Sequence, residues 1–429
     1  MSVLLRNGMI VTQNEKREIL EGSIYVEDAN IVEVGRTRTE ADHVIDCSGK
    51  VVVPGLINTH NHVANSLIRG FADDLHLESM LERTFDFDAK VTRRDIQVGA
   101  LLGCLEMMKS GTTTFVDLFY WEDEVARAVR EAGMRALLGW AVLDEEFSTQ
   151  KGKPLQNCSS FIRRHKQEEL IAPLVSLMGV RVCSEETFLA GKQLAEEEDV
   201  MVHMHLSETR KEVYDHQRKT GMRPVEWLDR IGFLCNRLLA AHAGWVTIGE
   251  VRMLATNGVS ISHCPVSNMK LATGCVAPLP EMFENEITVS LGTDSPVSNN
   301  SLNMFETMKF CALLHKADRW DARVLPAQKV LDLATIEGAR AIGMEDKIGS
   351  IEEGKRADLA ILDFRTARTS PYDKSRVVSH LVYSFGASDA VTTIINGRIV
   401  VREGKAEHLK EDVILDRAKE IVVELFEEE

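Results

Sequence analysis

The sequence predicts a (β/α)8 barrel inserted into a small β-sandwich domain that both chain ends build. Two observations support this fold class. Short strand-like runs punctuated by Gly, Asn and Asp fill residues 1–53 and return in residues 349–410. Between them, in residues 54–348, apolar strand-like runs alternate with amphipathic helices, which is typical of βαβ units and a parallel sheet. Roughly eight such units suit a closed barrel better than an open doubly wound sheet.

The two chain ends supply the strands of the small domain. The N-terminal strands are expected at Ser2–Leu5, Met9–Val11, Gly22–Glu27, Asn30–Val34, His43–Asp46 and Lys50–Val53. The C-terminal strands are expected at Asp358–Asp363, Val377–Val382, Ala390–Ile395 and Arg398–Val401. The pair Asn396-Gly397 between the last two runs is a strong hairpin signal.

The central region supplies the barrel. Helical spacing of apolar residues predicts helices over Arg93–Ser110 and Glu122–Ala132. After the run that ends at His62, the remaining barrel strands are expected at Thr112–Asp117, Arg135–Ala141, Leu174–Val182, Val200–His205, Leu238–His242, Ser260–His263 and Thr288–Asp294. The tail, residues 411–429, is predicted as a charged surface helix over Ile414–Phe426.

Composition excludes several classes of protein. The chain has 429 residues and a net charge of −16, which argues against nucleic acid or an anionic membrane as the main partner. No apolar run approaches the roughly 18–20 residues needed to cross a bilayer, and the N-terminus lacks a signal-peptide layout. Eight scattered cysteines without a C-x-x-C pair indicate reduced, mostly buried thiols. We therefore expect a cytoplasmic protein, and a homo-oligomer as is common for such barrels.

Two histidines follow the strand-like run that begins at Val51. His60 and His62 are spaced i, i+2, so on a strand both imidazoles point to the same face. Neutral imidazoles in that arrangement make half of a site for a divalent metal such as zinc. A lone His-x-His is as readily explained by two solvated histidines in a loop.

Three further strands end in groups that could complete this site. They supply His205, two residues after His203, then His242, and finally Asp294. The C-terminal ends of parallel barrel strands open on one face, where barrel active sites lie. Each residue alone has an ordinary reading, as a hydrogen-bonded core histidine or a helix N-cap aspartate. Together with His60 and His62 they predict one metal-binding cavity.

The motifs around these residues resemble the amidohydrolase superfamily. Within it, the chain is similar to the branch of cytosine deaminase-like enzymes, triazine hydrolases and deaminases of adenosine analogues such as 5′-methylthioadenosine and S-adenosylhomocysteine. The stretches that carry the resemblance cover nearly the whole chain. They are PGLINTHNH at 54–62, RGFADDL at 69–75, SGTTT at 110–114, HMHLSET at 203–209, HCPVSN at 263–268, GTDS at 292–295, SNN at 298–300 and GSIEEGKRADL at 349–359.

The resemblance implies a ligand set and a mechanism. It implies metal binding by His60, His62, His205 and Asp294, with His242 against the attacking water or the substrate. It places the ligand directly before Leu-Ser-Glu, which selects His205 rather than His203. Binuclear members carry a bridging lysine on the fourth strand, and Leu174–Val182 has none, so one divalent ion is expected. Zinc is the first choice and iron or manganese the alternatives.

The implied reaction is hydrolysis at a ring carbon with release of ammonia. Asp294 would act as general base towards the attacking water, and His242 would stabilise the charge that develops. Glu208 would pass a proton to a ring nitrogen and, with Asp294, to the leaving group.

The implied substrate is an adenosine-type nucleoside. Three residues are candidates for binding it: Asp88 for the ribose, Trp140 for the ring and Arg181 in place of an arginine that the branch carries elsewhere. The branch's ribose-binding glutamate and a histidine in the turn after its fourth strand have no match here. A deaminase or hydrolase of guanine, a pterin, cytosine or a triazine therefore stays open, as does a catalytically silent binding protein on the same fold.

Overall fold

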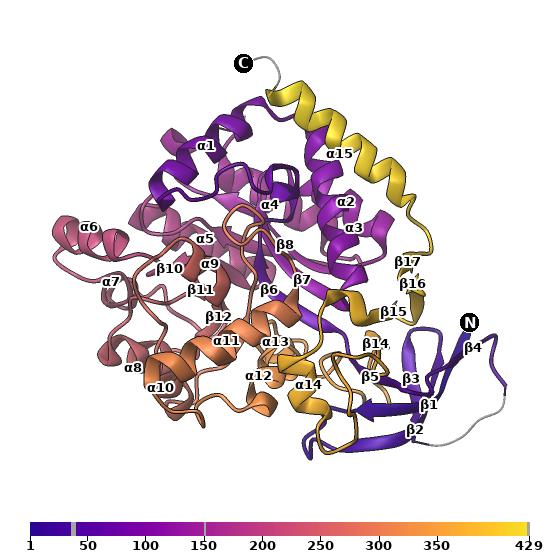
Figure 1. Ribbon diagram of the computed structural model, residues 1–429. Helices are drawn as coiled ribbons and strands as arrows, with labels where there is room; N and C mark the ends of the chain where they lie inside the picture. The colour runs from indigo at the N-terminus through magenta and orange to yellow at the C-terminus, as the bar shows by residue number, and fades with distance from the viewer. Residues whose placement is uncertain (36–39, 150–151, 427–429) are drawn as a thin grey trace.

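A parallel barrel forms the centre of the molecule (Figure 1). A computed structural model describes residues 1–35, 40–149 and 152–426. Eight parallel strands follow one another around the barrel in chain order. They are β6 (Leu56–Asn61), β7 (Thr112–Phe119), β8 (Arg135–Val142), β9 (Ile171–Leu177), β10 (Val202–Leu206), β11 (Leu238–His242), β12 (Ser260–His263) and β13 (Val289–Leu291). The predicted barrel class is confirmed.

The first and last strands close the barrel through contacts just above β13. The Asp294 backbone N–H donates to the His60 carbonyl at 2.9 Å, and the Thr59 hydroxyl donates to the Leu291 carbonyl at 2.9 Å. Gly292 permits this approach, because a Cβ there would lie only 2.8 Å from the His60 Cβ. Closure therefore places Asp294 directly beside His60.

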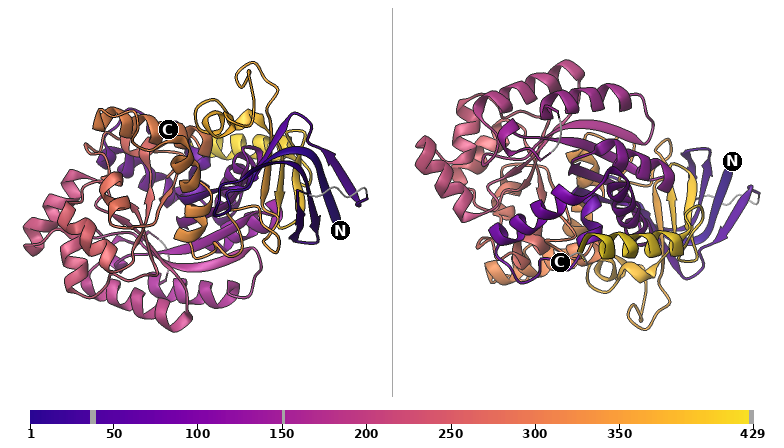
Figure 2. Two further views of the ribbon diagram at one scale, coloured as in Figure 1. Left: turned by 90° about the horizontal axis from the view of Figure 1, so that it is seen from below. Right: turned by 90° about the horizontal axis from the view of Figure 1, so that it is seen from above.

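As predicted, both chain ends build one β domain, whose strands form a second sheet with nine strands among the described residues (Figure 2). Its strands are β1 (Ser2–Val11), β2 (Ile19–Glu27), β3 (Asn30–Val34), β4 (His43–Asp46), β5 (Lys50–Pro54), β14 (Leu359–Asp363), β15 (Ala390–Ile395), β16 (Arg398–Arg402) and β17 (Lys405–Ala406). The two ends meet where β5 pairs antiparallel with β14. The predicted segments 1–53 and 411–429 include residues 36–39 and 427–429, which lie outside the described residues.

Helices surround the barrel (Figure 1). Those before β11 are η1 (Val63–Ile68), α1 (Leu77–Lys90), α2 (Arg93–Lys109), α3 (Glu122–Ala132), η2 (Glu145–Phe147), α4 (Pro154–His165), α5 (Glu185–Glu198), α6 (Arg210–Thr220) and α7 (Pro224–Arg230). Those after it are α8 (Ile248–Thr256), α9 (Pro265–Lys270), α10 (Leu279–Glu284), α11 (Met304–Arg319), α12 (Ala327–Leu333), α13 (Ile336–Ala341), α14 (Val377–Tyr383), η3 (Ala387–Asp389) and α15 (Glu411–Phe426).

One predicted strand was wrong. Residues 377–382 form helix α14, although Val377, Val378 and Val382 favour a strand in isolation. Packing reverses this preference, because Val377 and Leu381 are spaced i, i+4 and bury one helical face against α11 and α12. The barrel strand predicted at Leu174–Val182 also begins and ends earlier: β9 spans Ile171–Leu177, and the residues that follow form a turn.

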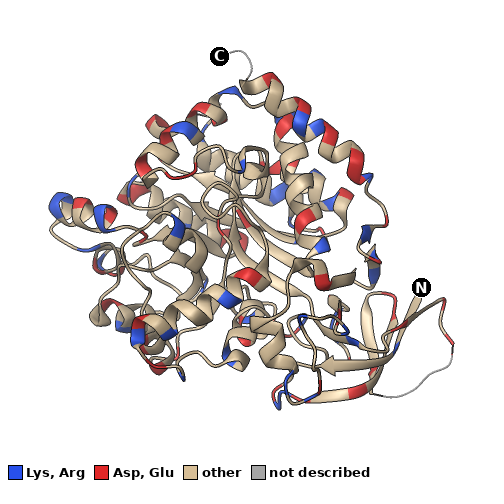
Figure 3. Ribbon diagram, viewed as in Figure 1, with Lys and Arg blue, Asp and Glu red and all other residues tan. Residues whose placement is uncertain are grey.

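The C-terminal helix α15 runs beside α2 towards α1 (Figures 1 and 2). It buries Ile414, Ala418 and Ile421, and its Phe426 ring lies 4.2 Å from the Phe71 ring. Acidic and basic residues are interspersed along the outer helices (Figure 3). Within the described ranges, no helix has the length and apolar character that a membrane span requires.

Candidate active site

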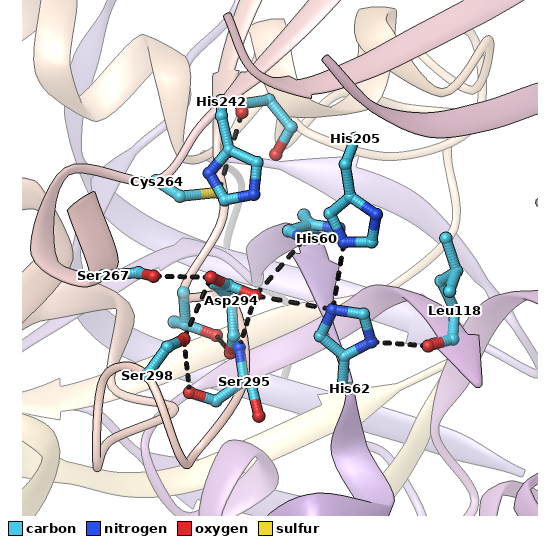
Figure 4. A network of polar contacts seen from close by, with 12 residues as sticks. His60, His62, Leu118, His205, His242, Cys264, Ser267, Asp294, Ser295 and Ser298 are labelled. Atoms are coloured by element: carbon cyan, nitrogen blue, oxygen red, sulfur yellow. Dashed lines mark hydrogen bonds and ion pairs between the residues drawn. The ribbon is translucent and has the colours of Figure 1, made fainter. Parts of the chain in front are cut away.

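A cavity of about 480 Å³ opens at the C-terminal ends of the barrel strands. Its floor holds five of the predicted residues, namely His62, His205, Glu208, His242 and Asp294, while His60 lies beneath them and is fully buried. Figure 4 shows the side chains of His60, His62, His205 and Asp294 converging. Four separate stretches of sequence are thus brought together, because each ends a barrel strand or follows one.

Two of the histidines are oriented by backbone carbonyls. His62 Nδ1 lies 2.6 Å from the Leu118 carbonyl and His205 Nδ1 lies 3.1 Å from the Met178 carbonyl. A carbonyl oxygen only accepts, so both rings carry their proton on Nδ1 and present a bare Nε2. These two Nε2 atoms lie 3.2 Å apart. Burial lowers the pKa of both rings, so both are neutral near pH 7 and their lone pairs face each other.

His60 adds a third bare nitrogen. Its Nδ1 lies 2.8 Å from His203 Nε2, and its Nε2 is buried without a hydrogen-bond partner in the described chain. Burial lowers the pKa of His60 to about 4. His203 itself points at His60 rather than into the cavity. Strand β10 thus directs His205 into the site and His203 towards the ring of His60.

Asp294 completes the set with a carboxylate. Its Oδ1 lies 3.4 Å from His60 Nε2 and 3.5 Å from His62 Nε2. Its Oδ2 accepts hydrogen bonds from the Ser267 hydroxyl at 2.5 Å and the Ser298 hydroxyl at 2.9 Å. The two serines therefore hold Oδ2, while Oδ1 accepts the Ser295 backbone N–H at 2.7 Å and faces the histidines (Figure 4).

This constellation fits a divalent metal ion. Three nitrogen lone pairs and one carboxylate oxygen face each other without a proton to share, which is unfavourable unless a cation lies between them. Ligand atoms around a tetrahedral zinc ion lie roughly 3.3–3.6 Å apart, and the distances here are 3.2, 3.4 and 3.5 Å. The donor set of three imidazoles and one carboxylate suits zinc, iron or manganese.

Acid–base groups adjoin the metal set. The Glu208 carboxylate, the His242 ring and the Asp294 carboxylate bring one ligand atom each within 4.8 Å of one another. Burial raises the pKa of Glu208, which favours a carboxyl that carries a proton. His242 Nδ1 donates to the Asn268 side-chain oxygen at 3.0 Å, so its Nε2 is an acceptor towards the cavity.

The Glu208 loop is held by a residue that the sequence analysis missed. Glu212 accepts the backbone N–H groups of Ser207 at 3.1 Å and Glu208 at 3.0 Å. Glu212 lies in the first turn of α6, where an acidic residue caps backbone donors. Its spacing after Glu208 was visible in the sequence, but the bend of the chain that makes it useful was not.

Helix α1 forms one wall of the cavity. Phe85 and Asp88 line it, and Asp88 lies inside the helix rather than in a loop after it. The Asp88 side chain is buried, its Oδ1 has no partner within the described residues, and burial raises its pKa to about 8. A buried carboxyl oxygen without a partner at the cavity wall can bind a polar group of a ligand.

The other two candidate substrate residues differ in their outcome. Arg181 lines the cavity, donates to the Thr209 hydroxyl at 3.1 Å and lies 3.9 Å from a Glu212 oxygen. Trp140 does not reach the cavity. It packs between Trp121 and Phe161 on the helix side of β8, because strand side chains alternate and Ala141 takes the inward position. The prediction that Trp140 binds the substrate ring is therefore corrected: Trp140 packs in the hydrophobic core.

A second group of histidines lies outside the cavity. His263 and His315 are fully buried with their Nε2 atoms 3.1 Å apart, and Cys311 is nearby. This Nε2–Nε2 distance suits a hydrogen bond in which one ring donates to the other, whereas the facing Nε2 atoms of His62 and His205 are both bare.

Comparisons with known proteins agree with the geometry. The model of the amidohydrolase family matches residues 51–400, and the chain belongs to that family. The 5′-deoxyadenosine deaminase of Methanosarcina mazei is 39% identical over 99% of this chain and 98% of its own length. The 5-methylthioadenosine/S-adenosylhomocysteine deaminase of Thermodesulfovibrio yellowstonii is 38% identical over 97% of each chain. The resemblance inferred from the motifs is confirmed.

Solved structures share the whole fold. An adenosine deaminase from Xanthomonas campestris with bound zinc superposes with a TM-score of 0.95 at 30% identity, covering 99% of this chain and 98% of the other. The atrazine chlorohydrolase of Arthrobacter aurescens, complexed with zinc, gives 0.91 at 23% identity over 98% of this chain and 100% of its own, which shows the common fold.

Proposed function

We propose that the chain is a metal-dependent hydrolytic deaminase of adenosine-type nucleosides, with 5′-deoxyadenosine, 5′-methylthioadenosine, S-adenosylhomocysteine and adenosine as the candidate substrates. One observation carries the proposal: Glu208, His242 and Asp294 converge within 4.8 Å at the floor of a cavity beside a cation-binding set. Full-length relatives at 38–39% identity with nucleoside deaminase activity in their names support the substrate class.

The metal expected is one zinc ion, held by His60, His62, His205 and Asp294. When bound, such an ion supplies Lewis acidity that makes water a nucleophile near neutral pH. Side chains of the protein carry out the proton transfers. Asp294 Oδ1 lies at the position of a base that accepts the proton of the attacking water, and the two serines on Oδ2 keep it there.

Glu208 and His242 act on the substrate side. Glu208, whose pKa is raised by burial, donates a proton to a ring nitrogen, so electron density at the amine-bearing carbon falls and water can add. His242 Nε2 accepts a hydrogen bond from the attacking water and so orients it for addition to the ring carbon. The proton taken by Asp294 then passes to the exocyclic amine, which leaves as ammonia.

The ribose is assigned to the α1 wall. With the amine at the floor, the sugar lies towards the open side of the cavity, where Asp88 Oδ1, which has no hydrogen-bond partner among the described residues, can bind its hydroxyl groups. Such binding would give this buried oxygen the hydrogen bond that it lacks. Arg181 stands at the same cavity but is anchored by Thr209 and Glu212.

The test is ammonia release from a substrate panel. We expect turnover of the adenosine-type nucleosides and little with free adenine, guanine, cytosine, pterins or triazines. If only one of those other rings is turned over, that ring and not a nucleoside is the substrate. A zinc-loaded protein that releases ammonia from no compound of the panel would be a binding protein on this fold.

Two variants test the assigned roles. Glu208→Gln and Asp294→Asn should each reduce kcat by about 10²–10⁴-fold, because each loses a proton-transfer group. Glu208→Gln should still bind one zinc ion per chain, whereas Asp294→Asn should bind zinc more weakly. The exposed Glu196→Gln is the control and should retain full activity. Undiminished turnover in Glu208→Gln would contradict the assignment.

A further inference from the structure

The metal ligand His60 differs from its two partner histidines in what holds it. His62 and His205 are each fixed by a backbone carbonyl, whereas His60 Nδ1 meets the ring of His203 at 2.8 Å. His60 and His203 are both fully buried, so water cannot substitute for this contact.

The direction of the His60–His203 hydrogen bond follows from a third group. His203 Nδ1 lies 2.8 Å from the Leu239 carbonyl, which only accepts, so the proton of His203 is on Nδ1 and its Nε2 is an acceptor. His60 must then donate through Nδ1, which leaves His60 Nε2 as a bare lone pair. That atom is the one aimed at Asp294 Oδ1, and it is unpartnered in the described chain.

We propose that His203 is a positioning residue that fixes the tautomer and orientation of His60, and thereby sets the affinity of the barrel mouth for its metal ion. The relay runs from the Leu239 carbonyl on β11 through His203 on β10 to His60 on β6. The two histidines of β10 thus have different roles: His205 binds the metal ion directly, and His203 orients His60, a metal ligand on β6. The proposal rests on the metal site of the proposed function, but not on the identity of the substrate.

The test measures binding of Zn²⁺ alone, by competition with a chromophoric chelator, to protein first stripped of metal. Leucine at 203 removes the acceptor and leaves the His60 Nδ1 proton unsatisfied, so His203→Leu should raise the Kd for zinc by about 10–100-fold. Glutamine carries an acceptor oxygen and a donor nitrogen on one side chain, so His203→Gln can still accept from His60 and donate to Leu239. Its Kd should lie within about threefold of the unmodified protein's.

A matched control separates positioning from general loosening. His315→Leu removes another fully buried His–His contact, 3.1 Å to His263, that touches no metal ligand. It should lower the thermal midpoint and leave the zinc Kd unchanged. Equal weakening of zinc binding in His315→Leu and His203→Leu would overturn the proposal, as would unchanged zinc binding in His203→Leu or a Gln variant as weak as the Leu variant.

A second measurement needs no substitution. ¹⁵N-labelled histidines in the zinc-loaded protein report which ring nitrogen carries the proton, and His203 should be the Nδ1–H tautomer. An Nε2–H tautomer at His203 would deny His60 its acceptor and overturn the proposal. Both readouts are independent of ammonia release, so they stand even if the substrate is not a nucleoside.

Discussion

At the residue scale, the burial of Asp88 makes the stability of the fold depend on pH. Its carboxyl is buried in the cavity wall, its Oδ1 has no partner among the described residues, and burial raises its pKa to about 8, against an ordinary value near 3.9. The folded chain therefore binds a proton more tightly than the unfolded chain does. Between about pH 4 and pH 8 the unfolded state loses that proton first, so the free energy of unfolding falls as the pH rises.

Asp88→Asn should remove this pH dependence. Asparagine resembles the neutral acid in shape, so near pH 4 the variant and the unmodified protein should unfold with similar free energies. By pH 8 the variant should be the more stable by at least about 1 kcal/mol, since one pKa unit corresponds to ~1.4 kcal/mol. Denaturant unfolding at several pH values measures this. Asp86→Asn, an exposed acid on the same helix, is the control and should show no such divergence.

The residues of the site were predictable to different degrees. His60, His62, His205, His242 and Asp294 end strands, and that pattern is written in the sequence. The supporting residues are not: Ser267 reaches Asp294 from helix α9 and Ser298 from the loop after β13, and Asp294 itself adopts a positive φ of 62°. Such strained backbone is set by the surrounding fold, so sequence position alone cannot reveal it.

At the scale of elements, helix α1 is tied over the cavity by a polar clasp. Lys270 at the end of α9 donates to Asp73 at 2.7 Å, to the Val297 carbonyl at 2.8 Å and to Asn300 at 2.9 Å. Asn300 also donates to Asp73 at 2.8 Å. The clasp joins the segment that leads into α1 to the loop after β13, which carries Asp294. It gives a physical role to the 69–75 and 298–300 motifs.

Breaking the clasp should loosen α1 without unfolding the barrel. Asp73→Asn removes the charge that Lys270 neutralises, which we expect to cost about 1 kcal/mol for a partly exposed pair. Amide hydrogen exchange in residues 77–90 should accelerate by about fivefold, and KM should rise by a similar factor with kcat little changed. Asp215→Asn breaks the exposed pair with Lys211 and should alter neither. Unchanged exchange in α1 would show that apolar packing alone holds it.

Element types were predicted well where pattern and packing agree. The barrel strands and the hairpin at Asn396-Gly397 follow from local pattern, and β15 and β16 flank that turn. Helix α14 was misassigned because its valines favour a strand until α11 and α12 supply a partner for one helical face. Local preference is weaker than tertiary burial, so a short apolar run of this length is ambiguous in sequence.

At the scale of the molecule, barrel and sheet are joined by a buried ion pair. Arg135, the first residue of β8, donates to both Asp358 carboxylate oxygens at 2.7 and 3.2 Å and to Asn396 at 3.3 Å. Only 4% of the Arg135 side chain and 2% of the Asp358 side chain are exposed. Asp358 also accepts the Asn396 backbone N–H at 2.7 Å. One carboxylate thus links the barrel, the start of β14 and the hairpin before β16.

Removing the arginine should destabilise the whole chain rather than the sheet alone. Arg135→Met leaves a buried carboxylate without its cation, which should lower the free energy of unfolding by about 3–5 kcal/mol. The matched control is Arg130→Met, which breaks an exposed pair with Glu168 at 3.0 Å and should cost less than about 1 kcal/mol.

Denaturant unfolding followed by far-UV circular dichroism and by tryptophan fluorescence distinguishes two outcomes. Since Trp121, Trp140, Trp227, Trp245 and Trp320 all lie between residues 54 and 348, fluorescence reports on the barrel. Coincident transitions, both shifted to lower denaturant in Arg135→Met, would show that barrel and sheet unfold as one unit, whereas an unshifted fluorescence transition would contradict that coupling.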